Sequence, residues 1–87
     1  KLRIEVETRN LKEVQEALEV GGVDVIMLDN MNTTMMKEAV AMIAGKVETE
    51  ASGGITHETI AAVAECGVDF ISVGALTHSI KSMDISL

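Results

Sequence analysis

The sequence predicts an α/β fold in which strands and helices alternate and the strands lie parallel. Strand-like and helix-like patterns follow one another with a period of about 22 residues. A glycine follows each of the helical patterns, as is typical of helix exits. The chain has no Pro, a single Phe, no Trp and no Tyr, yet 47% of its residues are hydrophobic. We therefore expect an ordered aliphatic core rather than a disordered segment.

The first repeat is a strand over Leu2–Glu7, where apolar and charged residues alternate, followed by a helix. Asn10 can cap the free amides of this helix, and Glu13 three residues later completes a capping box. The apolar stripe of the helix comprises Leu11, Val14, Ala17 and Leu18. Gly21 and Gly22 can adopt the left-handed conformation in which helices often end.

The second repeat begins with a short apolar strand, Val25–Leu28, that ends in Asp29. Either Asn32 or Thr33 can cap the helix that follows, and Gly45 comes after its end. The residues expected to face inward from this helix are Met36, Ala39, Val40 and Ile43. The methionines at helical spacing indicate core packing rather than a cofactor site.

The third strand is predicted over Val47–Ala51, with Thr56 as the cap of the next helix and Gly67 at its exit. The stripe of that helix comprises Ile60, Val63 and Ala64. The fourth strand is predicted over Phe70–Val73. Two short elements are expected after it, a helical turn over Leu76–Ser79 and a strand over Ile85–Leu87.

Repeated strand–helix units imply a parallel sheet with right-handed crossovers, and ligands of such sheets bind at the carboxyl ends of the strands. Each predicted strand end carries a carboxylate or a small residue that exposes the backbone. These candidates are Glu7; Asp29 and Asn30; Ser52, Gly53 and Gly54; and Val73, Gly74 and Ala75. Their coincidence at one edge predicts a binding site there.

Strand parity places the acidic residues on the face opposite the apolar one. Leu2, Ile4 and Val6 should pack against the helices. The opposite face would then hold Glu5, Glu7, Asp29, Glu48 and Glu50, with Arg3 as its only base. Buried carboxylates need nearby cations, which could come from a metal, another part of the protein or another chain. The alternative is an ordinary two-layer sheet whose glutamates are half-exposed and solvated.

Two of the strand-end loops have the composition of a phosphate site. Ser52, Gly53 and Gly54 precede the predicted helix start, where backbone amides favour an anion. The adjacent Val73–Ala75 loop could close around the same phosphate, although both loops could also be plain turns. His78 is a further candidate because it follows the second loop, whereas His57 is expected to be a solvated surface residue.

The charge and the cysteine content indicate which partners and which compartment to expect. The formal net charge is −7, from 14 Asp and Glu against 7 Lys and Arg, which disfavours nucleic acid as a partner. Cys66 is the single cysteine, expected to be a buried small residue in a reducing compartment, the cytoplasm. No apolar run approaches the roughly 18 residues of a membrane span, so no membrane is expected as a partner.

Several motifs occur in the order found in a known family. They are Glu5-Val6-Glu7, Ile26-Met27-Leu28-Asp29-Asn30-Met31, Glu50-Ala51-Ser52-Gly53-Gly54-Ile55-Thr56, Gly67-Val68-Asp69-Phe70-Ile71-Ser72-Val73-Gly74-Ala75-Leu76-Thr77-His78-Ser79, and Asp84-Ile85-Ser86-Leu87. The string resembles quinolinate phosphoribosyltransferase, also called carboxylating nicotinate-nucleotide pyrophosphorylase. The resemblance covers essentially the whole chain. A paralogue with the same barrel, associated with molybdenum transport, is similar in the same motifs.

The resemblance implies that residues 1–87 are the C-terminal part of an open TIM-like βα barrel, without the N-terminal sandwich domain and the early barrel strands. It implies a parent enzyme that joins quinolinate to phosphoribosyl pyrophosphate and releases pyrophosphate and carbon dioxide in NAD biosynthesis. Glu7 and Asp29 match the catalytic carboxylates near Mg²⁺ and the ribose, binding the metal directly or through water. The loops Ser52–Gly54 and Val73–Ala75 match those that hold the 5′-phosphate, and the family works as a homo-oligomer.

Two functions from different classes remain. The chain opens in strand-like sequence without an initiator Met and ends in another strand-like run, so we expect a piece of a larger enzyme. Because the chain offers few bases for anionic substrates, we expect this piece to be inactive alone. The alternative is an excised or designed βα module with a structural or self-association role. A third, weaker hypothesis is that the chain is a piece of another phosphate-binding βα barrel.

Overall fold

The structure, a computed structural model, describes residues 2–74 and 76–79, apart from the side chains of Leu76 and His78. The elements in chain order are β1 (Glu5–Thr8), α1 (Leu11–Val20), β2 (Val25–Asp29), α2 (Thr33–Ile43), β3 (Glu48–Ser52), α3 (Ile60–Glu65), β4 (Phe70–Val73) and β5 (Leu76–Ser79). Within the described chain the strands form one sheet in the order β1-β2-β3-β4-β5. The strands β1 to β4 pair in parallel, which confirms the predicted α/β repeats, and β5 joins β4 antiparallel.

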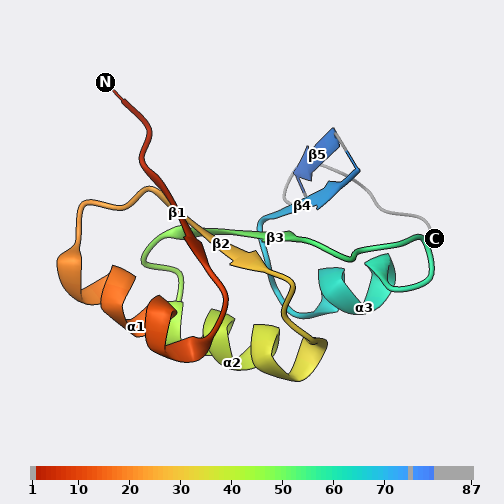
Figure 1. Cartoon of the computed structure of the whole chain (residues 1–87), viewed down its shortest axis with the longest axis horizontal. Coiled ribbons are helices and arrows are strands. Elements are labelled where there is room, and N and C mark those ends of the chain that lie inside the picture. The colour runs from red at the N-terminus through yellow and green to blue at the C-terminus, as the bar shows by residue number, and fades with distance from the viewer. Residues whose placement is uncertain (1, 75, 80–87) are drawn as a thin grey trace.

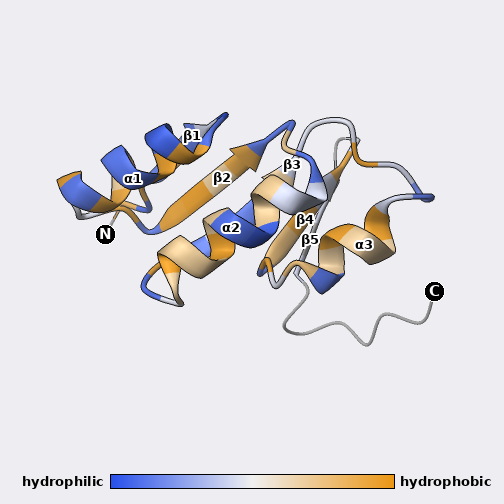
Figure 2. Cartoon of the chain, turned by 90° about the horizontal axis from the view of Figure 1, so that it is seen from below, coloured by the Kyte–Doolittle hydropathy of each residue, from blue (hydrophilic) through white to orange (hydrophobic). Residues whose placement is uncertain are grey.

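The helices α1, α2 and α3 all lie on one side of the sheet, so the described chain has two layers (Figure 1). Between the layers is an aliphatic core, as the sequence predicted. Its fully buried members from the strands include Ile26, Leu28 and Ile71, which alternate with residues of the other face. Strand β2 is hydrophobic along most of its length, whereas α1 and α2 carry hydrophilic residues on their outer sides (Figure 2).

Helices α1 and α2 begin where their caps predict. The Asn10 side chain accepts a hydrogen bond from the Glu13 amide at 2.9 Å, which confirms the predicted cap. The Glu13 carboxylate accepts a hydrogen bond from the Arg9 amide, not from the Asn10 amide that a capping box requires, so only half of the predicted box forms. Asn32, rather than Thr33, caps α2 by accepting from the Met35 amide at 2.8 Å. No helix in the described part of the chain is long and apolar enough to span a membrane.

The first strand is shorter than predicted, because pairing with β2 begins only at Glu5. Leu2 and Ile4 are 87% and 49% exposed, so the expectation that they pack against the helices is wrong. Val6 does pack against the core, and Thr8 is fully buried on the same face. Alternation alone does not reveal how far the helical layer extends over a strand at the edge of a sheet.

Two predicted helical segments differ in the structure. Helix α3 begins at Ile60 rather than after Thr56, because residues 57–59 form a turn in which Thr56 Oγ1 accepts a hydrogen bond from the Glu58 amide. The segment Leu76–Ser79 is not a helical turn but strand β5. Its backbone pairs with the edge that β4 would otherwise expose. The predicted strand 85–87 lies outside the described residues.

Candidate functional site

The carboxyl ends of the four parallel strands lie along one edge of the sheet, here called the carboxyl edge. Asp29 pairs with Ser52 at the ends of β2 and β3, and Glu7 lies one residue before the end of β1. Gly53 directly follows β3, and Gly74 directly follows β4. The structure therefore brings Glu7, Asp29, Gly53 and Gly74 to one edge, as parallel strands require.

The face of the sheet without helices carries the acidic residues and is here called the acidic face. The strand register places on it Glu5, Glu7, Asp29, Glu48 and Glu50, the set that parity predicted. Their exposure differs, because Glu50 is only 8% exposed whereas Glu5 and Glu7 are exposed. The described chain thus matches the alternative, a two-layer sheet with exposed or half-exposed acidic residues (Figure 1), at every position of this set except Glu50.

Two arginines reach carboxylates of the acidic face. Arg3 extends from the start of β1 across β2 to Glu48, at 2.9 Å, and its guanidinium lies 5.7 Å from the centre of the Phe70 ring. Arg9, just beyond β1, has its Nε 3.8 Å from Asp29 Oδ2. The expectation that Arg3 is the only base on this face is wrong. Arg9 was missed because the strand was predicted to end at Glu7, although Arg9 has the same parity as Glu5 and Glu7.

Glu7 and Asp29 are the predicted metal ligands, and they lie on the same face of adjacent strands. The Asp29 side chain is 31% exposed, and Glu7 is exposed. In the part of the chain that the structure describes, no three His, Cys, Asp or Glu side chains form a group that could hold a metal ion. Mg²⁺ often takes one or two carboxylates together with water and phosphate oxygens. The pair fits that donor set only when a ligand completes it.

The loop after β3 lies directly against the end of β2. Asn30 has a left-handed backbone conformation, with φ of 56°, and its amide donates to the Ser52 carbonyl at 2.9 Å. Gly53 and Gly54 also have positive φ, of 79° and 71°. A pocket of about 380 Å³ lies between these residues and the starts of α2 and α3. The glycine loop predicted to bind phosphate thus adjoins a hollow at the carboxyl edge.

The helix start does not contribute to this loop as expected. Helix α3 has six residues, and the side chain of its N-cap residue, Thr59, makes no capping hydrogen bond. The residues between Gly54 and Ile60 separate the glycines from the helix. Any anion at Gly53 and Gly54 would therefore be held by loop amides and not by a helix terminus.

The second predicted loop is only partly described. Val73 ends β4, and Gly74 is exposed with φ of 62° in the turn that leads into β5. Ala75 lies outside the described residues. His78 is in β5, where its backbone position pairs with Ile71, but its side chain is outside the description.

Some polar interactions near the site were not predicted from the sequence. Thr8 is fully buried and donates its hydroxyl to the Met27 carbonyl at 2.8 Å, which ties β1 to β2. Glu50 accepts a hydrogen bond from Ser72 Oγ at 2.6 Å, and that oxygen lies 2.9 Å from Thr77 Oγ1. These partners are 19, 22 and 5 residues apart, so no local pattern could reveal them.

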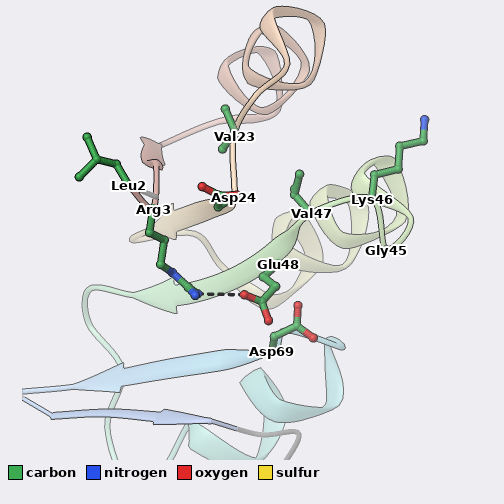
Figure 3. A pocket seen from close by; sticks show the side chains of 9 residues that line it. All are labelled: Leu2, Arg3, Val23, Asp24, Gly45, Lys46, Val47, Glu48 and Asp69. Carbon is green, nitrogen blue, oxygen red and sulfur yellow. Dashed lines mark hydrogen bonds and ion pairs between the residues drawn. The ribbon is translucent and has the colours of Figure 1, made fainter.

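A larger pocket, of about 700 Å³, lies at the opposite, amino ends of the strands (Figure 3). Its charged lining is largely engaged in holding the sheet together. Arg3 pairs with Glu48, Asp24 accepts from the Ile4 amide at 2.8 Å, and Asp69 accepts from the Thr49 amide at 3.0 Å. Because these groups serve the fold, we place the candidate site at the carboxyl edge despite the smaller hollow there.

Comparisons with known proteins agree with this arrangement. Residues 1–87 match the family model described as quinolinate phosphoribosyl transferase, C-terminal domain. The chloroplastic nicotinate-nucleotide pyrophosphorylase (carboxylating) of Arabidopsis thaliana is 50% identical over 97% of this chain and 28% of the relative. The probable nicotinate-nucleotide pyrophosphorylase (carboxylating) of Bacillus subtilis is 43% identical over 99% of this chain and 29% of the relative.

A solved structure of a relative has the same fold. The nicotinate-nucleotide pyrophosphorylase from Francisella tularensis aligns with a TM-score of 0.75 and 46% identity, over 82% of this chain and 25% of that one. The chain thus spans less than a third of the length of the relatives it matches. The family match over the whole sequence and these identities show that the chain belongs to the C-terminal-domain family of the quinolinate phosphoribosyltransferases.

Proposed function

We propose that this chain forms the C-terminal part of the barrel of a quinolinate phosphoribosyltransferase. The whole enzyme would join quinolinate to phosphoribosyl pyrophosphate and form nicotinate mononucleotide, pyrophosphate and carbon dioxide in NAD biosynthesis. The observation that carries this proposal is the convergence of Glu7, Asp29, Gly53 and Gly74 on one edge, in a chain that matches the family throughout.

Each candidate group suits one part of that reaction. Loss of pyrophosphate leaves positive charge on the ribose, which the carboxylates of Glu7 and Asp29 can stabilise. The amides of Gly53, Gly54 and Gly74 can approach a 5′-phosphate closely because these residues lack side chains. Mg²⁺, held by Glu7 and Asp29 directly or through water, would neutralise the pyrophosphate that leaves. The remaining contribution of the chain is to fix the relative positions of these groups.

The negative charge of the chain suggests that basic groups for the substrates come from outside these 87 residues. Quinolinate and phosphoribosyl pyrophosphate are both anionic, while the chain has a net charge of −7. Of its bases, Arg9 is the one that lies beside a predicted site carboxylate among the described residues, 3.8 Å from Asp29. We therefore propose that other segments or a second copy of the protein in a homo-oligomer bring the bases that bind the substrates. A cytoplasmic location is part of the same proposal.

The test is an assay of the whole protein that contains this chain. Asp29→Asn and Glu7→Gln should each lower kcat by about 10²–10³-fold, because each removes one charge opposite the developing cation. Glu5→Gln is the matched control, since Glu5 is exposed on the same face of the same strand but nearer the amino edge. Failure of the wild-type protein to make nicotinate mononucleotide would refute the proposal. Equal effects of all three substitutions would refute the assigned roles.

The second candidate function, a self-associating structural module, is favoured by one observation. Leu2 and Ile4 are exposed next to β1, which is an edge strand of the described sheet. Sedimentation of the whole protein and of this chain alone separates the two functions. An active whole protein supports the enzyme, whereas an inactive protein in which only this segment drives dimerisation supports the module.

A further inference from the structure

Gly53 occupies a position in which a side chain would collide with a candidate catalytic carboxylate. A Cβ atom added there would lie 2.6 Å from Asp29 Oδ1, closer than such atoms approach in proteins. It would also lie 3.0 Å from the backbone nitrogen of Asn30 and 3.3 Å from its Cα. The side chain of Asp29 could rotate away, but the backbone of Asn30 could not yield as easily.

The end of β2 and the loop after β3 are held at this short separation by the backbone. The Asn30 amide donates to the Ser52 carbonyl at 2.9 Å, one residue beyond the last paired position of the two strands. The left-handed conformation of Asn30 suits an Asn side chain better than most others. The Asn30 Oδ1 atom lies 3.2 Å from the place where a Cβ of Gly54 would be. The segments Asp29-Asn30 and Gly53-Gly54 therefore lie against each other.

Resting on the proposed function, we propose that Gly53 is a positioning residue for Asp29. The bare Cα of Gly53 leaves the space that the Asp29 carboxylate occupies. The hydrogen bond between Asn30 and Ser52 keeps the two segments in register. The carboxylate that faces the metal and ribose and the loop that binds the phosphate are thereby held as one unit, independently of any contact that Gly53 itself makes with the phosphate.

The first test is a double-mutant cycle on thermal unfolding of the whole protein, with Gly53→Ala, Asp29→Ala and the double variant. Asp29→Ala removes the oxygen that the new Cβ meets, so the fall in Tm caused by Gly53→Ala should be clearly smaller in that background. Gly45→Ala is the matched control. Gly45 has nearly the same φ, 77° against 79°, but a Cβ there meets nothing within 4 Å. Its Tm effect should be the same in both backgrounds.

The second test separates positioning from a purely structural role. Gly53→Ala should lower kcat and raise the Mg²⁺ concentration needed for half-maximal rate by about 10-fold or more, because the carboxylate has moved. Gly54→Ala, whose Cβ meets only the Asn30 side chain, should raise the KM for phosphoribosyl pyrophosphate and leave the Mg²⁺ requirement unchanged. An unchanged Mg²⁺ requirement in folded Gly53→Ala, or an additive Tm cycle, overturns the inference.

The inference can still be tested if Gly53→Ala does not fold or if the wild-type protein lacks transferase activity. If Gly53→Ala does not fold, the amide resonance of Gly53 in ¹⁵N-glycine-labelled wild-type and Asp29→Ala protein replaces the cycle. A shift at Gly53 but not at Gly45 supports the contact, and no shift overturns it. If the wild-type protein lacks transferase activity, the proposed function fails, while the Tm cycle or the amide shift still decides whether Gly53 positions Asp29.

Discussion

Asp69 and Thr49 exchange hydrogen bonds at the amino end of the sheet. The Asp69 amide donates to the Thr49 carbonyl at 2.9 Å, and the Thr49 amide donates to Asp69 Oδ2 at 3.0 Å. Asp24 and Ile4 repeat the same exchange between β1 and β2, at 2.9 and 2.8 Å. In both places the Asp directly precedes one strand and bonds the chain at the start of the neighbouring strand. Each such exchange of hydrogen bonds is here called a clamp. The clamps set the register that later brings the strand ends together at the carboxyl edge.

Loss of the Asp69 clamp should destabilise the protein. Asp69→Ala removes the acceptor of the Thr49 amide, and Thr49 is only 3% exposed, so water replaces that bond poorly. We expect the free energy of unfolding to fall by about 1–3 kcal/mol. Asp69→Asn keeps an oxygen acceptor and should cost less. Urea unfolding of the variants checks this, and equal losses for the two substitutions would contradict the clamp.

The Asn10 cap of α1 makes a smaller and separate contribution to the free energy of unfolding. Asn10→Ala removes the acceptor of the Glu13 amide and should lower the free energy of unfolding by about 1 kcal/mol. Asn10→Asp should retain most of the stability, because a carboxylate at a helix start also favours the helix dipole. The measurement is again the urea midpoint. A loss with Asn10→Asp as large as with Asn10→Ala would show that the cap is not the cause.

Cys66 should be protected from thiol reagents in the folded protein. Burial raises the pKa of its thiol above the ordinary 9.0, although Lys37 nearby partly opposes this. Its Sγ also lies 3.3 Å from the Ala62 carbonyl. Labelling by a disulfide reagent at pH 8 should be slow until denaturant is added. Rapid stoichiometric labelling of native protein would contradict the buried position.

The same raised pKa gives a direction for the pH dependence of stability. The folded state holds the thiol proton more tightly than the unfolded state, so this contribution is complete below about pH 9 and is lost as pH rises through the folded-state pKa. Cys66→Ser abolishes it. The difference in unfolding free energy between wild type and Cys66→Ser should therefore shrink above pH 9. A difference that grows above pH 9 would contradict a raised pKa of the thiol in the folded state.

The 87-residue chain alone should show no transferase activity. It has twice as many acidic as basic residues, 14 against 7, and the substrates are anions. Arg3, one of its bases on the acidic face, is already paired with Glu48. The check is an assay of highly purified chain for nicotinate mononucleotide, beside the whole protein as a positive control. Steady turnover above background would contradict this expectation.

Local signals predicted the parts of the fold that depend on local chemistry. Asn10 and Asn32 mark helix starts because their side chains bond amides three residues away. Short runs of mainly apolar residues predicted β4 with its exact bounds and β2 to within one residue. The acidic face followed from parity, since a period of two assigns alternate residues to opposite faces.

The features that were missed depend on distant partners. Strand β5 forms because the edge of β4 offers backbone groups, and nothing in Leu76–Ser79 itself distinguishes a strand from a turn. The close approach of Gly53 to Asp29 joins the loop after β3 to the end of β2, so Gly-Gly alone could indicate only a turn or a phosphate loop. The exposure of Leu2 was missed because alternation says nothing of what covers a strand.

The convergence of the strand ends on a phosphate site is tested most directly by the glycine amides. Phosphoribosyl pyrophosphate with Mg²⁺ is titrated into ¹⁵N-glycine-labelled whole protein. We expect the amide resonances of Gly53, Gly54 and Gly74, at the carboxyl edge, to shift together with one dissociation constant. Those of Gly21, Gly22 and Gly45, at the opposite end, should stay in place. Saturable shifts at the second group and none at the first would contradict it.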